Sequence, residues 1–464
     1  MPSSLHTFYE DKITFYSGQI QTVQKRLSLI AWLRLIVFAG LALIIYQLIK
    51  TGFPNAILCV ALLLLFIFSG LVGLASRYKD RRSLLEKLLY VNTNELGVLK
   101  NELNGFEDGK NFLSQESYLD DLDIFGTRSL FHMLNRTTTS HGRDRLASLL
   151  KQSLLSPEEI KKYQEAVRIL AKQADERQAL LAEGLLNQEK EGNLHSLADW
   201  LESPARLIRK KWVLISRWIL VLYNTSCLMA WAITDNYRPL LIGILAGWII
   251  TALFSGYIAE QHAQLSKKNG ILEQYLSILW LFRKVDAGES AVLRTMKGET
   301  GLACLAIRRL AKLSTFFDQS LNFLIGFFLN NLFLYNLNCV IALEKWKEAH
   351  KKSFPAWIDL VGNIECLNSF STFAFNNPHY AYPIPLSDGK SFIGAVQMAH
   401  PLIAAEDRVP NDFSIGRNER LILVTGSNMS GKTTFLRTAG VNLLLAQCGA
   451  PVCAGSFSFT PMQV

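Results

Sequence analysis

Four apolar stretches, each close to twenty residues long, constrain this chain more than any other feature. They cover residues 27–49, 56–75, about 212–233 and 239–258. A helix of about 20 apolar residues matches the thickness of the hydrocarbon core of a bilayer. The first two stretches carry only one charge between them, on Arg34, and a short segment joins the members of each pair. The sequence therefore predicts two membrane hairpins with four spans in a lipid bilayer.

Basic residues border both hairpins. Those beside the first are Lys25, Arg26, Arg77, Lys79, Arg81 and Arg82, and those beside the second are Arg206, Arg209, Lys210, Lys211, Lys267 and Lys268. Because positive flanks stay in the cytoplasm, both turns are expected outside, in a multi-pass protein of the inner (cytoplasmic) membrane with its soluble parts in the cytoplasm. The alternative is that the spans are buried core helices of a large soluble protein, and Arg217 and Asn224 make the second pair less apolar.

Residues 320–343 form a fifth hydrophobic stretch, which differs from the others in its amide content. It holds Asn322, Asn330, Asn331, Asn336 and Asn338. Five amides in one span would be costly in lipid. We interpret the stretch as one long buried cytoplasmic helix, with contact to the membrane as the alternative.

The remaining segments are expected to be mostly helical. Apolar spacing predicts helices over 84–105 and 156–185, with Ser156 as a helix cap, and a turn at 137–146 that leads into another helix. The helical pattern over 261–373 is broken at 288–291, 297–301 and 353–357. A loop rich in proline, asparagine and glycine at 375–390 then precedes β-like runs at 391–396 and 420–426, and a helix from Thr433 to about Cys448 closed by Gly449.

The expected fold class is therefore mainly α, with membrane hairpins and a helical core and lever region, followed by the start of an α/β P-loop NTPase domain. The expected segments are 1–83 with the first hairpin, 84–205 as the first helical half, 206–262 with the second hairpin, 263–375 as the second helical half, and 376–464 as the nucleotide domain.

The net charge and the cysteine content exclude few classes of function. The net charge of +9 fits a nucleic-acid partner, and it also fits the basic flanks of membrane spans. The seven cysteines are scattered and form no C-x-x-C pair, which argues against a disulfide framework and a zinc site.

One motif carries chemistry. Gly426 and the run Gly431, Lys432 and Thr433 satisfy the phosphate-binding pattern G-x-x-x-x-G-K-[ST]. An apolar strand is expected before it at 421–424, and a helix after it whose core-facing residues are Phe435, Leu436, Ala439, Leu443 and Leu444. In such a unit backbone N–H groups bind the phosphates of ATP, the lysine neutralises the β- and γ-phosphates, and the threonine hydroxyl ligates Mg²⁺. The alternative is a glycine turn with a solvated lysine.

The predicted nucleotide-binding residues are Gly426, Ser427, Asn428, Met429, Ser430, Gly431, Lys432, Thr433 and Thr434, with Lys432 also catalytic and Thr433 the Mg²⁺ ligand.

The stretch at 424–454 closely resembles the nucleotide loop of the MutS family of DNA mismatch-repair ATPases, whose loops read like T-G-x-N-M-x-G-K-[ST]-[ST]. "AHPLI" at 399–403 and "VPNDFSI" at 409–415 agree with it, and 118–150 and 357–374 resemble the family's core and lever. The resemblance implies ATP with Mg²⁺, dimerisation through the ATPase domains and association with DNA. It also implies that Asn428 braces the phosphate site, and that the residues near the adenine are Val409, Pro410 and Asn411.

The chain departs from the family in three ways. The tripeptide "FYE" at 8–10 matches the family's mismatch-reading F-x-E element, but we interpret it as coincidence, because the first span begins at residue 27. The second hairpin stands where the family carries its DNA-gripping clamp. The chain also ends before the acidic strand and the signature loop that ATP hydrolysis needs, so we expect a fragment of a longer protein.

The first hypothesis is thus a membrane-anchored, MutS-like dimeric ATPase related to mismatch repair that lacks the mismatch-reading domain. The second is a membrane scaffold that binds nucleotide without turnover or DNA binding, and the third, less favoured, is a transport ATPase.

Overall fold

A computed structural model describes residues 2–51, 55–113, 118–186, 193–265, 269–319, 323–387, 391–416, 421–425 and 431–462. The chain divides into two compact units. The first comprises residues 1–107 with 181–186, and the second comprises 108–180 with 187–464.

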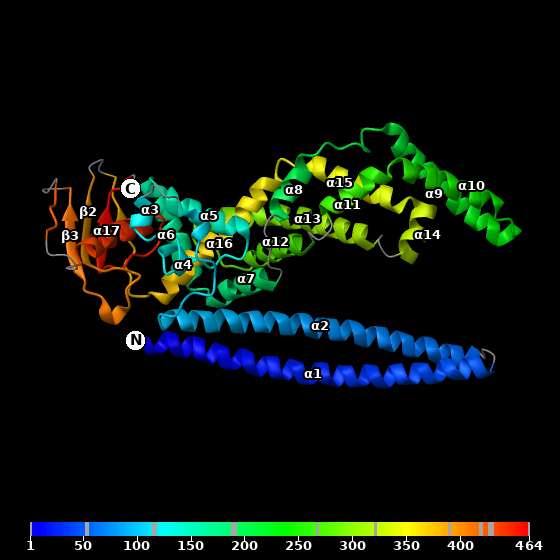
Figure 1. Ribbon diagram of the computed structural model, residues 1–464, viewed down its shortest axis with the longest axis horizontal. Helices are drawn as coiled ribbons and strands as arrows, with labels where there is room; N and C mark the ends of the chain where they lie inside the picture. Colours follow the sequence, from blue (N-terminus) through cyan, green and yellow to red (C-terminus); the bar gives the residue numbers. More distant parts are fainter. Residues whose placement is uncertain are drawn as a thin grey trace. The chain divides into compact units, whose positions relative to one another are not determined.

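The first unit is built on two long antiparallel helices, α1 (Pro2–Thr51) and α2 (Asn55–Leu99) (Figure 1). At 1.5 Å per residue they are about 75 and 68 Å long, so each helix extends well beyond its apolar stretch of about 30 Å. Arg26 Nη1 donates to the Tyr78 hydroxyl at 3.0 Å, where the apolar stretches end and the basic residues begin. The hairpin therefore has an apolar half next to its turn and a polar half that continues the same helices.

Most apolar side chains of that half are exposed, such as Ile36 and Phe66, which are 66% and 79% exposed. Exposed apolar surface of this extent marks contact with a membrane or another protein. The tripeptide at 8–10 lies inside α1. The helix predicted over 84–105 ends earlier, because α2 stops at Leu99 and a turn follows in which Glu102 N donates to Gly97 O.

Helices dominate the second unit, and residues 181–186, which belong to the first unit, form the end of one of them. They are α3 (Tyr118–Asp121), α4 (Leu130–Leu134), α5 (Ser140–Lys151), α6 (Pro157–Ala171), α7 (Ala174–Leu186), α8 (Asn193–Glu202), α9 (Lys211–Thr234), α10 (Arg238–Leu253), α11 (Ser255–Leu265), α12 (Asn269–Phe282), α13 (Ala291–Gln319), α14 (Phe323–Phe333), α15 (Tyr335–His350), α16 (Phe354–Asn376) and α17 (Lys432–Gln447). Two short 3₁₀ turns, Lys110–Phe112 and Ala405–Asp407, accompany them. The helical prediction is confirmed.

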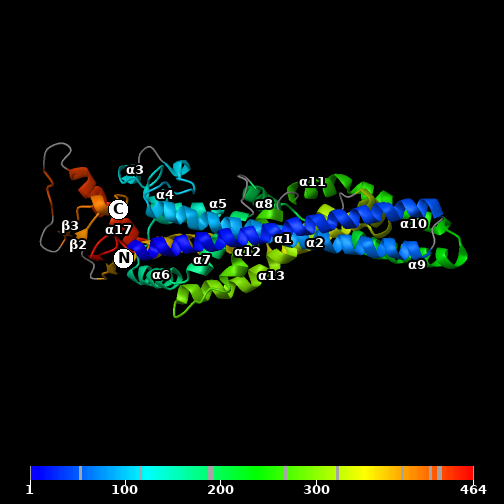
Figure 2. The same cartoon turned by 90° about the horizontal axis from the view of Figure 1, so that it is seen from below.

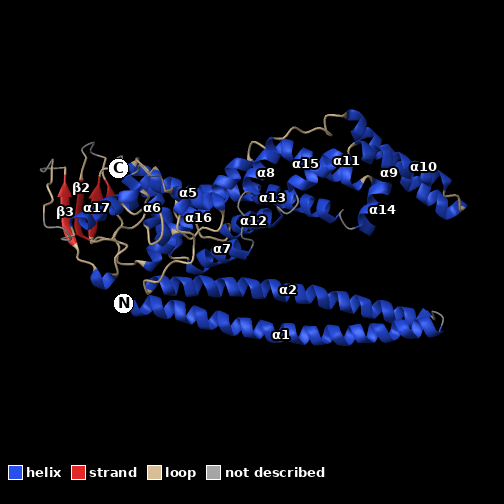
Figure 3. Ribbon diagram, in the orientation of Figure 1, coloured by secondary structure: helices blue, strands red, loops and turns tan. Residues whose placement is uncertain are grey.

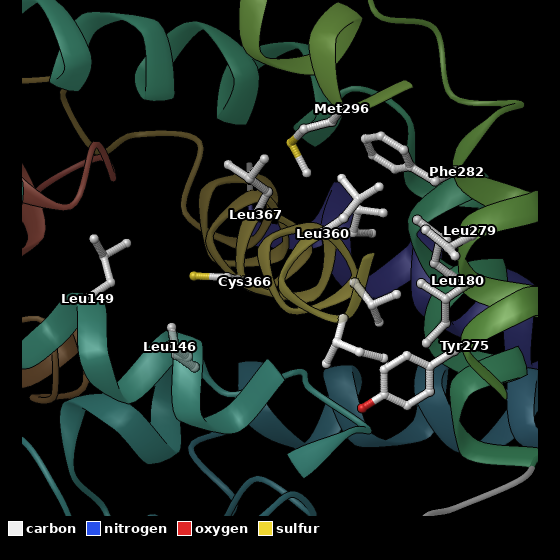
Figure 4. Packing of buried hydrophobic residues seen from close by; sticks show 14 of the residues in the cluster. Leu146, Leu149, Leu180, Tyr275, Leu279, Phe282, Met296, Leu360, Cys366 and Leu367 are labelled. Carbon is white, nitrogen blue, oxygen red and sulfur yellow. The ribbon is translucent and has the colours of Figure 1, made fainter. Parts of the chain in front are cut away.

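Helix α16 lies at the centre of the core (Figure 4). Its Leu360, Cys366 and Leu367 are surrounded by α5, α12 and α13, and the labelled neighbours on those helices are Leu146, Leu149, Tyr275, Leu279, Phe282 and Met296. Nearly every residue from Leu360 to Ala374 is buried, polar ones included. The segment at 360–374 therefore forms the buried centre of this unit.

A buried carboxylate ties α16 to α5. Glu365 Oε1 accepts from the backbone N and the hydroxyl of Thr138, and Oε2 accepts from the same two groups of Thr139. Thr139 is also the N-cap of α5, accepting from Gly142 N at 3.0 Å. Burial raises the pKa of Glu365, and the threonine donors oppose that rise.

Several predicted boundaries are confirmed and others are wrong. Ser156 caps α6 as expected. The predicted helix 156–185 is two helices, because the chain turns at 172–173. The predicted break at 297–301 is absent, since α13 runs through it with Thr300 buried. The break at 353–357 is a real boundary, where α16 begins at Phe354.

The second hairpin consists of α9 and α10, but the predicted span 239–258 is not one straight helix. Helices α10 and α11 meet at residue 254 and bend by 63°. By length and composition, three of the described helices can cross a membrane, or four if the bent pair counts as one span. Four spans are therefore not established.

The prediction of one long helix over 320–343 is wrong. Residues 323–333 and 335–350 form α14 and α15, which meet at Leu334 in a left-handed conformation (φ 52°). Residues 320–322, including Asn322, lie outside the described residues.

A small mixed sheet occupies the opposite end of this unit from α9 and α10 (Figures 1, 2 and 3). Its strands are β1 (Ile384–Pro385), β2 (Ile393–Met398), β3 (Asn411–Ile415) and β4 (Ser456–Phe459), in the order β1-β4-β2-β3. Strand β1 runs parallel to β4, while β2 is antiparallel to β3 and β4. The β-like run at 391–396 is confirmed.

Candidate nucleotide-binding site

Helix α17 begins directly at the predicted phosphate loop. Gly431 precedes it with φ 83°, a backbone conformation that glycine adopts without strain, and Lys432 and Thr433 occupy its first turn. Gly431 has no side chain with which to cap the helix, and the first turn holds no acidic residue. The N–H groups of a helix's first turn have no carbonyl partners within the helix, so this end favours an anion.

The first turn is open. Thr433 and Thr434 are exposed, Lys432 is partly exposed, and Leu436 is exposed rather than facing the core as predicted. The Phe435 ring packs edge-on against Phe413 of β3, with 5.7 Å between the ring centroids. This contact attaches the start of α17 to the sheet and leaves the other side of its first turn accessible.

The second half of α17 is firmly held. Leu443 and Leu444 are buried as predicted, and so is Asn442. Asn442 Nδ2 donates to Ala399 O at 3.0 Å, and its Oδ1 accepts from Cys453 N at 2.8 Å. One amide therefore joins α17 to the segment that follows β2 and to the segment that precedes β4.

We expect Asn442→Ala to lower the free energy of unfolding of this end by about 2–3 kcal/mol, because buried donors and acceptors lose their partners. Asn411→Ala is the matched control, since exposed Asn411 makes a local hydrogen bond to Val409 O and should change stability by no more than about 0.5 kcal/mol. Thermal unfolding and proteolysis of the 399–462 segment measure both. Equal stability of the two variants would contradict this role.

An ion pair links α17 to the start of the helical core. Arg437 Nη1 contacts Asp123 Oδ2, and Gly440 lies against the Leu122 side chain, where a Cβ would come within 2.7 Å of Cδ2. His400 is buried just after β2, and its Nδ1 accepts from Leu402 N at 3.3 Å. Burial lowers the pKa of His400, and the negative charge of Asp123 opposes this shift.

The residues predicted near the adenine lie just before or at the start of β3. Val409 is 76% exposed, Pro410 is exposed, and Asn411 begins the strand. Their exposure leaves them accessible to a ligand, and the strand that Asn411 begins also holds Phe413, which contacts Phe435 of α17.

The predicted strand at 421–424 is wrong. Residues 421–425 take no regular secondary structure, and Leu421 and Leu423 are 84% and 82% exposed. A strand is stable only when its backbone groups pair, and no strand in the described part of the sheet lies against this segment.

The loop itself, with Gly426, Ser427, Asn428, Met429 and Ser430, lies outside the described residues. Among the residues that are described, His, Cys, Asp and Glu form no group of three suited to a metal ion. The Mg²⁺ role of Thr433 therefore stays a prediction.

Sequence reasoning missed Asp123, Arg437, Asn442 and His400. Two of these residues have a local sequence signal. Asn442 is a lone amide within an apolar helical run, and His400 lies in the 399–403 motif. The Arg437–Asp123 pair joins residues more than 300 positions apart, so no local pattern reveals it.

Comparisons with known proteins found relatives that match about a fifth to a quarter of this chain. The chain is 37% identical over 119 residues to the DNA mismatch repair protein MutS of Staphylococcus carnosus, covering 25% of this chain and 13% of that protein. It is 39% identical over 99 residues to Endonuclease MutS2 of Streptococcus suis, covering 21% and 12%. These matches support a relationship to the MutS family.

The match to Endonuclease MutS2 of a Geobacillus strain is similar, at 35% identity over 94 residues, which is 19% of this chain and 12% of that protein. No protein-family model matches the chain. The chain therefore spans about an eighth of the length of the MutS and MutS2 relatives it matches.

Proposed function

We propose that this protein is a membrane-anchored, MutS-like ATP-binding protein, and that its intact form is a dimeric ATPase associated with DNA and related to mismatch repair, without the mismatch-reading domain. The observation that carries the proposal is the start of α17, where the motif's Gly431, Lys432 and Thr433 form an open helix N-terminus fixed to the rest of the unit. The similarity to MutS and MutS2 proteins supports it.

The residue types of the motif support a nucleotide site. The Lys432 ammonium would neutralise the β- and γ-phosphates of ATP, and the Thr433 hydroxyl would take one position around Mg²⁺. The backbone from Asn428 to Thr434 would donate N–H groups to the phosphates, and Val409 to Asn411 would lie by the adenine. When bound, Mg²⁺ supplies charge neutralisation at the phosphates.

The membrane part of the proposal rests on exposed apolar helices. Helices α1, α2 and α9 are long and apolar enough to span a bilayer, and most of their apolar side chains are exposed. We propose an inner-membrane location in which α10 and α11 form a bent fourth span and both hairpin turns lie outside. We also propose that the chain is divided into segments 1–83, 84–205, 206–262, 263–375 and 376–464. ATP would bind between two protomers, whose levers would move with its turnover.

A second candidate, from a different class, is a membrane scaffold that binds nucleotide without turnover or DNA. The two differ in their response to DNA. We would reconstitute the full chain in lipid nanodiscs and measure Mg-ATP affinity, ATP hydrolysis and duplex-DNA binding over a range of salt concentrations.

The proposal expects DNA binding that weakens steeply with salt, because phosphate contacts release counterions. It also expects Mg-ATP affinity to change when DNA is bound. Nucleotide binding that is indifferent to DNA would favour the scaffold, and undetectable Mg-ATP binding would contradict both.

A further inference from the structure

The junction between α14 and α15 is an unusual piece of backbone. Leu334, which joins the two helices, has φ 52° and ψ 42°, in the left-handed region that residues other than glycine seldom adopt. A helix that stops there leaves the carbonyls of its last turn without helical partners. We call residues 329–338, which contain this junction, the elbow.

Asparagine side chains supply the missing partners. Asn338 Nδ2 donates to Phe333 O at 2.8 Å and to Leu334 O at 3.2 Å. Asn224 of α9 donates from Nδ2 to Leu332 O at 3.0 Å. The last two carbonyls of α14 are therefore paired, that of Leu332 by a helix of the second hairpin, while Leu334 O also accepts from Asn338 N as the first carbonyl of α15.

A second polar contact joins the elbow to the same helix. Arg217 Nη1 of α9 donates to Asn338 Oδ1 at 3.0 Å. Within the elbow, Asn336 N donates to Asn330 Oδ1 at 3.3 Å. Arg217 and Asn224 are the two residues that made the second hairpin less apolar by sequence, and both turn toward the elbow.

Helix α10 approaches through glycines. A Cβ at Gly247 would lie 3.2 Å from the Asn331 carbonyl oxygen, and one at Gly243 would lie 1.9 Å from Asn224 Oδ1. Small residues that allow close backbone approach are typical of helix contacts inside membranes. The elbow, α9 and α10 thus form one packed group, with Leu334 only 1% exposed.

The elbow lies at the depth of the middle of the hairpin. Asn224 is about 20 Å along α9, whose 24 residues extend about 36 Å. On the outward faces of the hairpin, Leu222 is 66% exposed and Trp248 is 60% exposed. Polar groups therefore face the elbow, and apolar side chains face away from it.

We infer that the elbow enters the lipid bilayer as a re-entrant element packed against α9 and α10. This inference rests on the proposed membrane anchoring. Irregular backbone occurs at membrane depth only where protein buries it or it faces a water-filled cavity. At the break Leu334 is buried, and the backbone carbonyls of Leu332 and Phe333 are paired. Three buried side-chain atoms nearby, Asn224 Oδ1, Asn336 Oδ1 and Arg217 Nε, have no hydrogen-bond partner among the described residues. Two of the asparagines that argue against a simple span, Asn338 and Asn330, bind backbone groups at the break.

The test places a genetically encoded fluorescent amino acid, one at a time, at three positions of the full chain in nanodiscs. The positions are Leu329 in the elbow, Leu222 on the outward face of α9, and Leu302 on α13. Leu302 is 73% exposed on the surface of the helical region and lies outside the second hairpin. The nanodiscs contain lipids brominated at the middle of the acyl chain, which quench nearby fluorophores.

We expect quenching at Leu329 and Leu222 and none at Leu302. Quenching at Leu222 without quenching at Leu329 would overturn the re-entrant elbow and leave the membrane anchoring intact. Absence of quenching at both would overturn the membrane anchoring itself, and the inference with it.

A variant links the effect to the proposed contact. Asn224→Leu removes the donor to Leu332 O while making α9 more apolar, so quenching should be lost at Leu329 and kept at Leu222. Tyr223→Phe is the control, because the Tyr223 hydroxyl donates to Pro239 O within the hairpin and not to the elbow. Equal quenching at Leu329 in both variants would contradict the role of Asn224.

Discussion

Replacing Lys432 with alanine is expected to weaken Mg-ATP binding by about 100-fold or more. A hydrogen bond between charged groups contributes about 1.5–3 kcal/mol, and the lysine is expected to contact two phosphates. Equilibrium binding of a fluorescent ATP analogue to the nanodisc-reconstituted chain measures the effect. Lys284→Ala is a matched control, since Lys284 lies over the Trp280 ring, far along the chain from α17.

Thr433→Ala should act differently from the lysine variant. Its hydroxyl is the proposed Mg²⁺ ligand, so the variant should lose the Mg²⁺-dependent part of the affinity and keep the affinity measured in EDTA. Unchanged Mg-ATP affinity in both Lys432→Ala and Thr433→Ala would remove the basis for a nucleotide site at the start of α17.

The second large effect is expected at Glu365. Glu365→Ala leaves two backbone N–H groups and two hydroxyls of Thr138 and Thr139 without their acceptor in a fully buried place. At about 1–3 kcal/mol for each unsatisfied buried group, we expect a loss of about 4 kcal/mol or more in the free energy of unfolding. Thermal unfolding in detergent measures the loss, and hydrogen exchange in the first turn of α5 locates it.

Two further variants serve as an intermediate case and as a control for Glu365→Ala. Glu365→Gln keeps one acceptor oxygen, so its stability should fall between those of the native chain and Glu365→Ala. Glu348→Ala is the control, since Glu348 makes an exposed ion pair with Lys351 on α15 and should change stability by less than about 1 kcal/mol. A Glu365→Ala variant as stable as Glu348→Ala would show that the carboxylate does not hold α5 to α16.

Local signals in the sequence predicted much of the fold. Ser156 and Pro157 predict the start of α6, and Gly449 predicts the end of α17. The apolar stretches predict α1, α2 and α9. These features depend on a few neighbouring residues, and the chemistry of a cap or of an apolar run is readable without knowing the rest of the structure.

Features set by distant contacts were not predicted. The glycines at 298 and 301 suggested a break, but α13 continues through them because its other face is buried against the core. Residues 320–343 were expected to form one long helix, whereas the chain breaks at Leu334, and Asn338 pairs with carbonyls at the break and with Arg217 of α9. The 421–424 run has strand-like residues, yet strand formation depends on a partner that a local pattern does not supply.

The candidate site shows the same division. The motif placed Lys432 and Thr433 correctly at the head of a helix, and it predicted the buried Leu443 and Leu444. It gave no sign of the Asn442 bridge or of the Arg437–Asp123 pair, which connect that helix to segments remote in sequence. These contacts join the end of the unit that holds α17 to the helical core.

Cysteine labelling in intact cells tests the central claim, that membrane hairpins carry a cytoplasmic nucleotide-binding unit. Single cysteines would replace exposed Asn236, in the turn between α9 and α10, and exposed Lys161, on α6, and labelling by a membrane-impermeant maleimide would be compared with that of the parent chain. We predict that Asn236→Cys is labelled from outside, and that Lys161→Cys is labelled only after lysis. Labelling of Lys161→Cys in intact cells, with Asn236→Cys protected, would contradict the account.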